Sequence, residues 1–369
     1  MNGLSGAKRV LIYSHDSFGL GHLRRCRAIA HALVEAEKDL SVLILSGSPI
    51  IGSFDFRARV DFVRVPGIIK LRNGEYTALK LHIGLERTLA LRASILQHTA
   101  EMFDPDLFLV DKEPLGLRGE VADALALLKG RGTRLVLGLR DVMDEPSLLE
   151  PEWRRKMVYT GYLRREIPAT PPSPDLVAFA QQPFILVTPG GGGDGDELID
   201  WVLRAYESGA DLPWRALLVF GPFMAPERQA EFRERAARLP NLMTKTFDAH
   251  IEALVARADG VVAMGGYNTF CEILSFDRRA ILVPRTRPRL EQYIRAASAE
   301  RLGLVRMLAD DGRREARRMA AALRRLPQQK RPSEAVLPGL LDGLANVHRL
   351  AAPWLGTERR PVRMALASG

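Results

Sequence analysis

The stretch ADGVVAMGGYNTFCEIL, from Ala258 to Leu274, gives the strongest indication of the fold in this chain. Its first seven residues, Ala258–Met264, predict a buried apolar strand, and the pair Gly265 and Gly266 then leads directly into a predicted helix. Such a turn exposes backbone N–H groups and the positive end of a helix at the carboxyl edge of a parallel sheet. Because α/β proteins bind phosphorylated ligands at this edge, the stretch predicts a nucleotide or nucleotide-sugar site.

The role of Glu272 is open at this point. In the first turn of the predicted helix, its carboxylate can reach a sugar hydroxyl. Thr269 and Glu272 also have the spacing of a capping box, in which the glutamate folds back onto the backbone. The sequence supports both interpretations equally.

The rest of the chain alternates short apolar runs with amphipathic stretches, which is typical of βα units and parallel sheets. At 369 residues the chain exceeds one ordinary core. We therefore expect two doubly wound α/β domains with a cleft between them. Residues 1–165 form the predicted N-terminal domain, 166–183 a proline-rich linker, 184–345 the nucleotide-binding domain, and 346–369 a last helix and tail. Within the first domain, residues 76–102 predict one long helix.

Charge and cysteine content narrow the function classes. The net charge is +9, but aromatic residues make up only 7% and no helix-turn-helix, RNP or zinc-finger pattern accompanies the arginines. We therefore expect no nucleic-acid partner. A general richness in arginine explains the charge, and attraction to an anionic membrane or substrate is the alternative. Cys26 and Cys271 form neither a metal-binding spacing nor a disulfide framework, which favours a reducing cytoplasm.

A histidine-containing loop, SHDSFGLGHLRR, follows the first predicted strand. Gly19 and Gly21 permit a tight turn, and His22 begins the next helix. The third glycine of a dinucleotide fingerprint is missing. His15, Asp16 and His22 are candidate catalytic groups, since a histidine can take a proton from a hydroxyl near neutral pH. The alternative is that His22 only caps its helix or binds backbone.

A glycine loop, FILVTPGGGGDGDELI, opens the second half of the chain. Its glycines allow backbone N–H groups to approach a diphosphate, and no P-loop lysine is present, so ATP hydrolysis is not implied. Asp194 and Asp196 suit N-cap positions, yet they would repel phosphate if they faced the site. A flexible loop is the alternative interpretation.

Two further sets of polar residues follow predicted strands. Glu291 and Gln292 end the loop VPRTRPRLEQ and offer groups that bind hydroxyls, while its arginines add positive charge near a diphosphate. In the first half, Asp111 and Glu113 are candidates to bind the acceptor or assist catalysis, with solvated loop acids as the alternative.

The G-x-G-H loop, the glycine loop and ADGVVAMGGYNTFCE followed by the EQ pair together resemble the MurG-type glycosyltransferases of the GT-B fold. The resemblance implies two Rossmann-like domains that face each other across a cleft. It also implies a nucleotide-sugar donor, most often a UDP-sugar, and an acceptor beside His22. The donor-binding residues that it implies are Gly191, Gly192, Gly193, Phe247, Asp248, Gly265, Gly266, Asn268, Thr269, Glu272, Glu291 and Gln292. Those on the acceptor side are Gly19, Gly21, Asp111 and Glu113.

The sequence therefore predicts a nucleotide-sugar-dependent glycosyltransferase that inverts at the anomeric carbon. His22 is the first candidate for the base, with His15 or Asp16 behind it, and no metal or other cofactor is expected. The acceptor is an unidentified hydroxyl, lipid-linked or on a polysaccharide, and the expected place is the cytoplasm or the inner face of the plasma membrane. A nucleotide-sugar 2-epimerase on the same fold and a non-catalytic nucleotide-sugar-binding protein are the alternatives.

Overall fold

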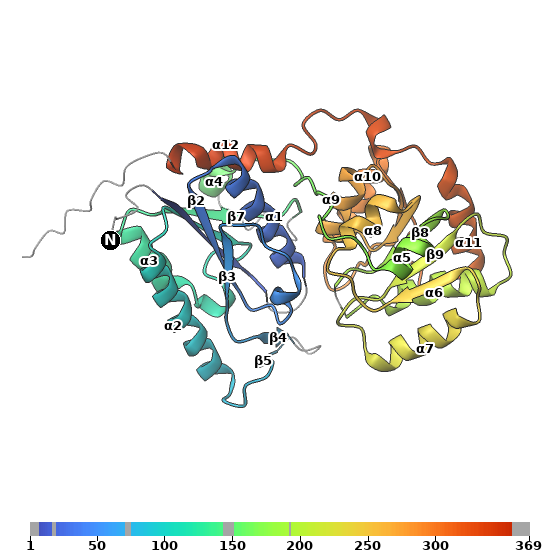
Figure 1. Ribbon diagram of the computed structural model, residues 1–369, viewed down its shortest axis with the longest axis horizontal. Coiled ribbons are helices and arrows are strands. Elements are labelled where there is room, and N and C mark those ends of the chain that lie inside the picture. Colours follow the sequence, from blue (N-terminus) through green and yellow to red (C-terminus); the bar gives the residue numbers. More distant parts are fainter. Residues whose placement is uncertain (1–6, 17–19, 71–74, 143–150, 192, 356–369) are drawn as a thin grey trace, which may run out of the picture. The chain divides into compact units, whose positions relative to one another are not determined.

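The computed structural model describes residues 7–16, 20–70, 75–142, 151–191 and 193–355. The chain divides into two compact units, each built on a parallel sheet with helices on both faces (Figure 1). The first unit runs to Arg140 and takes up the chain again from Leu344. The second comprises residues 141–343. These two α/β units confirm the predicted fold class.

The sheet of the first unit has the order β3-β2-β1-β6-β7, all parallel. Its strands are β1 (Lys8–Ser14), β2 (Leu40–Ser46), β3 (Val60–Arg64), β6 (Leu107–Asp111) and β7 (Arg134–Gly138). Its longer helices are α1 (Gly21–Ala36), α2 (Leu85–Phe103), α3 (Ala122–Gly130) and α12 (Gly343–Leu355). Figure 1 shows α2 and α3 on the face opposite α1.

The side chains of β1 point alternately toward the helices on the two faces of the sheet. Leu11 and Tyr13 join the core beneath α2 and α3. Because successive residues of a strand face opposite sides, Val10 and Ile12 point toward α1, whose Leu23 is also fully buried. α12 belongs to this unit, and its His348 contacts Glu37 at the end of α1 at 3.0 Å.

The sheet of the second unit has the order β10-β9-β8-β11-β12-β13, again all parallel. Its strands are β8 (Phe184–Thr188), β9 (Arg215–Val219), β10 (Leu242–Lys245), β11 (Gly260–Ala263), β12 (Arg279–Leu282) and β13 (Arg306–Met307). Its helices are α4 (Pro151–Lys156), α5 (Pro174–Phe179), α6 (Asp196–Glu207), α7 (Pro226–Ala237), α8 (Ile251–Arg257), α9 (Tyr267–Ser275), α10 (Glu291–Arg301) and α11 (Ala316–Arg325).

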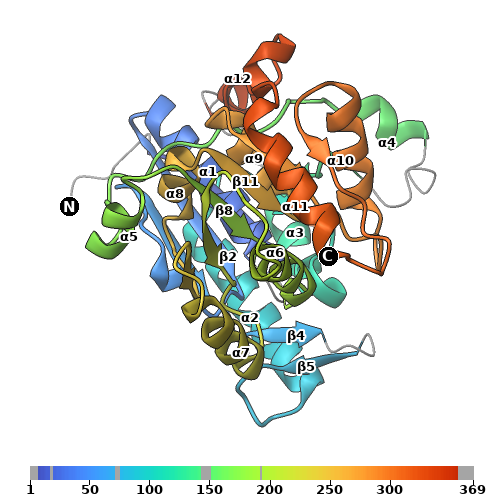
Figure 2. The ribbon, with the colours of Figure 1, turned by 90° about the vertical axis from the view of Figure 1, so that its right-hand side faces the viewer.

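Two apolar layers enclose this second sheet. Ile185 and Val187 of β8 face α6, α7 and α11, whereas Phe184 and Leu186 face α5, α8, α9 and α10. Figure 2 shows α6 and α8 on opposite sides of β8. The continuous apolar runs of these strands are therefore explained by burial on both faces.

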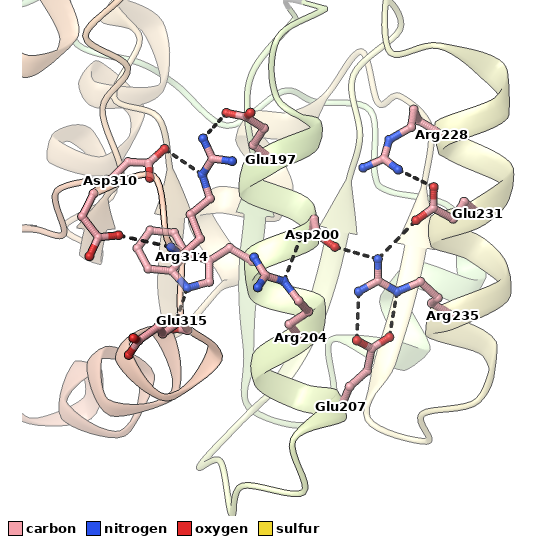
Figure 3. A network of polar contacts seen from close by, with 12 residues as sticks. Glu197, Asp200, Arg204, Glu207, Arg228, Glu231, Arg235, Asp310, Arg314 and Glu315 are labelled. Carbon is pink, nitrogen blue, oxygen red and sulfur yellow. Dashed lines mark hydrogen bonds and ion pairs between the residues drawn. The ribbon is translucent and has the colours of Figure 1, made fainter.

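A network of ion pairs links the helices on one of these faces (Figure 3). Arg235 of α7 contacts Asp200 of α6 at 2.7 Å and Glu207 at 2.8 Å. Near α11, Arg314 contacts Asp310 at 2.8 Å and Glu197 of α6. The network holds the outer surfaces of α6, α7 and α11 together, so many of the charged residues have structural partners.

Three features differ from the sequence-based expectation. The stretch 76–102 is not one helix: it begins with β5 (Tyr76–Ala78), which pairs with β4 (Ile68–Lys70), and α2 starts only at Leu85. The units divide after Arg140, not at residue 165. The predicted linker 166–183 contains α5, whose Leu176 and Phe179 are buried in the second core. No helix among the described residues is long and apolar enough to cross a membrane.

Candidate active site

The strand order of the second unit brings three loops to one edge. β8, β11 and β12 are neighbours, so the glycine loop after β8, the Gly265–Gly266 turn after β11 and the loop after β12 all leave the same carboxyl edge. This edge is where open α/β sheets bind ligands.

The glycine loop is shaped mainly by its backbone. Gly190 has φ +96°, a conformation that favours glycine, and a Cβ on Gly193 would lie 3.1 Å from the carbonyl oxygen of Phe223. Gly191 is half-buried, whereas Gly192 lies outside the described residues.

The N-cap interpretation of the two loop aspartates is wrong. α6 begins at Asp196 behind Gly195, and no side chain caps it. Asp194 instead contacts the guanidinium group of Arg285, and Asp196 lies 3.5 Å from Arg228. Both carboxylates therefore have arginine neighbours, and neither of them caps α6.

The turn after β11 has the predicted strand–glycine–helix form. Gly265 has φ +79°, and Gly266 is the N-cap of α9 with no side-chain cap. Because α9 already begins at Tyr267, Thr269 is its third residue and Glu272 its sixth. Glu272 therefore lies in the second turn, and the capping-box interpretation is wrong. Glu272 is fully buried, and its contact with ribose stays a prediction.

One buried side chain of α9 contacts the segment that precedes α5. The amide oxygen of Asn268 accepts a hydrogen bond of 2.6 Å from the guanidinium group of Arg165. Thr269 is also buried. Asn268 therefore already has a structural partner, which the sequence did not indicate.

The Glu291–Gln292 pair begins α10, as predicted. The buried Gln292 accepts a hydrogen bond from the backbone N–H of Arg285 at 3.2 Å, so it orders the loop after β12. One helical turn further, Arg295 donates to the Gly265 carbonyl oxygen at 2.8 Å and to both carboxylate oxygens of Asp141 at 2.7 Å. α10 thus supports two of the three loops.

Phe247 and Asp248 follow β10, the strand at one edge of this sheet. Phe247 is half-buried. The carboxylate of Asp248 lies 2.8 Å from the Lys245 ammonium group and accepts a 2.7 Å hydrogen bond from the backbone N–H of His250. Asp248 therefore shapes its own loop, and the proposed wall for the base stays a prediction.

In the first unit, His22 lies between groups of opposite charge. Its Nδ1 contacts the carboxylate of Asp111, at the end of β6, and its Nε2 lies 2.9 Å from the guanidinium group of Arg140. Burial is the main cause that lowers the pKa of His22 well below its usual value, and the Arg140 and Arg25 cations add to it. The ring is therefore neutral at pH 7. The alternative in which His22 caps its helix is not observed.

Asp111 is completely buried, so the alternative of a solvated loop acid is wrong for this residue. One of its carboxylate oxygens contacts His22 and the other contacts Arg25. Arg25 also donates to the backbone carbonyls of Gly138 at 2.6 Å and Leu139 at 2.9 Å. Arg25 and Arg140 are partners that the sequence did not indicate.

The other candidates of this loop differ in their surroundings. Asp16 accepts hydrogen bonds of 2.6 Å from Ser14 and Ser46 and one of 3.2 Å from the Leu23 N–H, so it ties β1, β2 and α1 together. His15 is buried, and its ring lies edge-on 5.6 Å from that of His22. The three hydrogen bonds give Asp16 a structural role, and catalytic roles of His15 and Asp16 stay predictions.

The remaining candidates on the acceptor side have simpler settings. Glu113 is part-exposed and lies 3.3 Å from Lys112. Gly21 is the first residue of α1, and Gly19 lies outside the described residues.

Comparison with known proteins identifies the class. Residues 191–335 match the glycosyltransferase family 28 C-terminal domain. This range includes the turn after β11 and the Glu291–Gln292 pair. No curated protein sequence matches the chain.

Solved structures match nearly the whole chain. CalG4, the calicheamicin glycosyltransferase, has a TM-score of 0.57 at 17% identity, covering 97% of this chain and 99% of that one. VinC, a glycosyltransferase in complex with dTDP, has a TM-score of 0.53 at 16% identity, covering 92% and 94%. UGT2 of Phytolacca americana, in complex with UDP-2-fluoro-glucose and pterostilbene, has a TM-score of 0.52 at 15% identity, covering 94% of each chain.

The domain match and the shared fold make this chain a glycosyltransferase of the GT-B type. Its similarity to the MurG group in particular stays a prediction.

Proposed function

We propose that this protein transfers a sugar from a nucleotide-sugar donor to a hydroxyl acceptor with inversion at the anomeric carbon. The observation that carries this proposal is the contact between the neutral ring of His22 and the buried carboxylate of Asp111. A histidine paired with a carboxylate is the arrangement of a general base whose partner fixes the tautomer and stabilises the imidazolium.

In this mechanism Nδ1–H of His22 donates to Asp111, so the lone pair of Nε2 is the proton acceptor. The acceptor hydroxyl gives its proton to Nε2 while its oxygen attacks the anomeric carbon, and the bond from that carbon to the diphosphate oxygen breaks. Arg140 donates to Nε2 in the structure, so the acceptor hydroxyl takes its place. The low pKa of His22 keeps the base unprotonated through the physiological range.

At the donor end, we propose that fixed positive groups stabilise the leaving nucleoside diphosphate without a metal ion. The N-terminal N–H groups of α9 lie behind Gly266, which has no capping side chain. Arg285 lies on the neighbouring loop after β12. Helix N-termini and arginines stabilise developing negative charge on phosphate oxygens. Glu272 is our candidate for the ribose hydroxyls, and Glu291 for the donor sugar.

UDP is the nucleotide we favour, because the MurG-type resemblance implies it. The dTDP bound to VinC makes a thymidine nucleotide the alternative.

We further propose that the acceptor is lipid-linked or part of a polysaccharide and that the protein lies in the cytoplasm. Its net charge of +9 would favour contact with an anionic membrane surface. A 2-epimerase would instead invert C2 of the donor sugar, so analysis of the sugar product formed without an acceptor separates the two enzymes.

Binding and turnover of candidate donors test the proposal. Thermal shift with UDP, GDP, dTDP and CDP should reveal one nucleotide that stabilises the protein, and release of that nucleotide from its glucose or N-acetylglucosamine ester should be measurable with water as a slow acceptor. If none of the four nucleotides stabilises the protein, the donor site is refuted.

Two histidine variants then separate an enzyme from a binding protein. His22→Gln should lower nucleotide release at least about 100-fold without weakening donor binding. His31→Gln is the matched control, because His31 lies on the same helix, where it accepts a hydrogen bond from the backbone N–H of Arg57 and lies edge-on to the ring of Phe56. Equal turnover in the two variants would refute His22 as the base.

A further inference from the structure

The contact between Asp194 and Arg285 joins two loops that are not neighbours at the sheet edge. Asp194 follows β8, Arg285 follows β12, and β11 lies between these strands. Adjacent strands are about 4.8 Å apart, so the two loops start about 10 Å from each other. The ion pair therefore reaches across the end of β11.

The turn that leaves β11 at this place is Gly265–Gly266 with the start of α9. The first N–H groups of α9 have no side-chain cap. The ion pair thus brings a carboxylate and a guanidinium group to the position where the proposed function places the donor diphosphate. A carboxylate and a phosphate make the same paired hydrogen bonds to arginine, so they compete for one guanidinium group.

The loop after β12 holds Arg285 in place independently of Asp194. Its backbone N–H donates to Gln292, and this glutamine is buried at the start of α10. The Arg285 Nε atom is buried and makes no hydrogen bond, although the side chain as a whole is 29% exposed. Asp194 is 43% exposed. Arg285 is therefore anchored at its backbone, whereas Asp194 can turn out into water.

We propose that Asp194 is an internal competitor of the donor: it holds the Arg285 guanidinium group until the donor's diphosphate replaces it. Arg285 is then a diphosphate-binding residue, and Asp194 sets the selectivity of the site for ligands with a full diphosphate charge. This proposal rests on the proposed function. It also explains why an acidic residue stands in the glycine loop, where a fixed negative charge would repel the donor.

If the diphosphate replaces Asp194 at Arg285, substitutions of these two residues should change nucleotide affinity in opposite directions. Removing the guanidinium group by Arg285→Gln takes away a charge-assisted contact with the diphosphate, which should weaken binding about tenfold. Removing the competing charge by Asp194→Asn frees Arg285, which should tighten binding about threefold, as fits a part-exposed pair. In the double variant the tightening should be lost in large part, because Asp194 no longer has a guanidinium group to hold.

Calorimetric titration measures the affinity of each variant for two ligands. The first is whichever of UDP, GDP, dTDP and CDP stabilises the wild-type protein most, and the second is its nucleoside, which lacks the diphosphate. Arg285→Gln should leave nucleoside affinity within about twofold. Arg301→Gln is the matched control, since Arg301 is an exposed arginine at the end of α10 that lies farthest from this loop in the sequence, and it should leave both affinities unchanged.

The outcomes separate this inference from the proposed function. A wild-type protein that binds none of the four nucleotides refutes the proposed function. A wild-type protein that binds one of them, with Arg285→Gln unchanged in affinity, refutes the inference alone. Weaker binding by Asp194→Asn also refutes it, because that result means that Asp194 supports the bound donor. Unfolding temperatures measured without ligand check that each variant is folded.

Discussion

Replacement of Asp111 by asparagine tests the structure of the first unit most sharply. The carboxylate is 0% exposed and contacts both Arg25 and His22. Asparagine keeps the shape of the side chain but removes the buried negative charge that contacts the Arg25 cation. Removal of one partner of a buried ion pair costs about 3–5 kcal/mol. Because Arg25 keeps the carbonyl oxygens of Gly138 and Leu139, we expect the lower end of that range.

The same substitution should slow the reaction. Without the negative charge, Nδ1–H of His22 loses the partner that fixes its tautomer and stabilises the imidazolium. Comparable losses in other enzymes lower kcat by about 10²–10⁴-fold. Urea unfolding measures the stability, and nucleotide release from the donor measures kcat. His22→Gln should show the loss of kcat with little loss of stability, because it leaves the contact between Arg25 and Asp111 in place.

The neighbouring acid supplies the control. Glu113→Gln removes a carboxylate that is 46% exposed, so we expect neither measurement to change. If Asp111→Asn unfolds at a lower urea concentration but keeps the wild-type kcat, Asp111 is a structural ion-pair partner and the proposed base is wrong. Wild-type stability in this variant would refute the argument from buried charge.

Three further substitutions test the second unit and the effect of pH. Glu272→Gln should weaken binding of the donor nucleotide about tenfold in calorimetry, and unchanged affinity would contradict the ribose contact. Burial lowers the pKa of His15 to about 4 from 6.5, so the unfolded chain binds more protons between these values and stability falls as the pH decreases through them. Urea unfolding at pH 7 and pH 5 should therefore show that His15→Gln reduces this loss by up to about 2 kcal/mol, and equal losses in both proteins would contradict it. Phe179→Ala should destabilise the second unit by about 3 kcal/mol or more, whereas a change below about 0.5 kcal/mol would support a linker.

The sequence predicted the sheet strands of both units well because their signals are local. β6, β8 and β10 lie in the short apolar runs that alternate with amphipathic stretches. The turn at Gly265 was found for the same reason. Hydrophobic periodicity and glycine pairs need no knowledge of distant residues.

The partners of the proposed base were not predictable in this way. His22 and its loop were recognised, but Arg25 and Asp111 lie 86 residues apart, and Arg140 lies 118 residues from His22. Only the order of β1, β6 and β7 brings them together. A single sequence shows which residues follow a strand, but it does not show which strands are neighbours.

The start of α9 illustrates a different error. The residues Thr269 and Glu272 fit a capping box, but Gly266 begins the helix with φ −57° and ψ 151°. A glycine can take this N-cap conformation without offering a side chain. The capping-box pattern therefore places the N-cap three positions too late, and Glu272 lies in the second turn of α9 rather than the first.

Proline content predicts a linker over residues 166–183, but the units divide after Arg140. A linker is a segment whose side chains are not buried in a core, and composition alone does not report burial. Leu176 and Phe179 pack in the second core. Asp141, directly after Arg140, is held by Arg295, whose guanidinium group also binds the Gly265 carbonyl oxygen. The second unit therefore begins at Asp141, whose carboxylate joins the same arginine that holds the turn after β11.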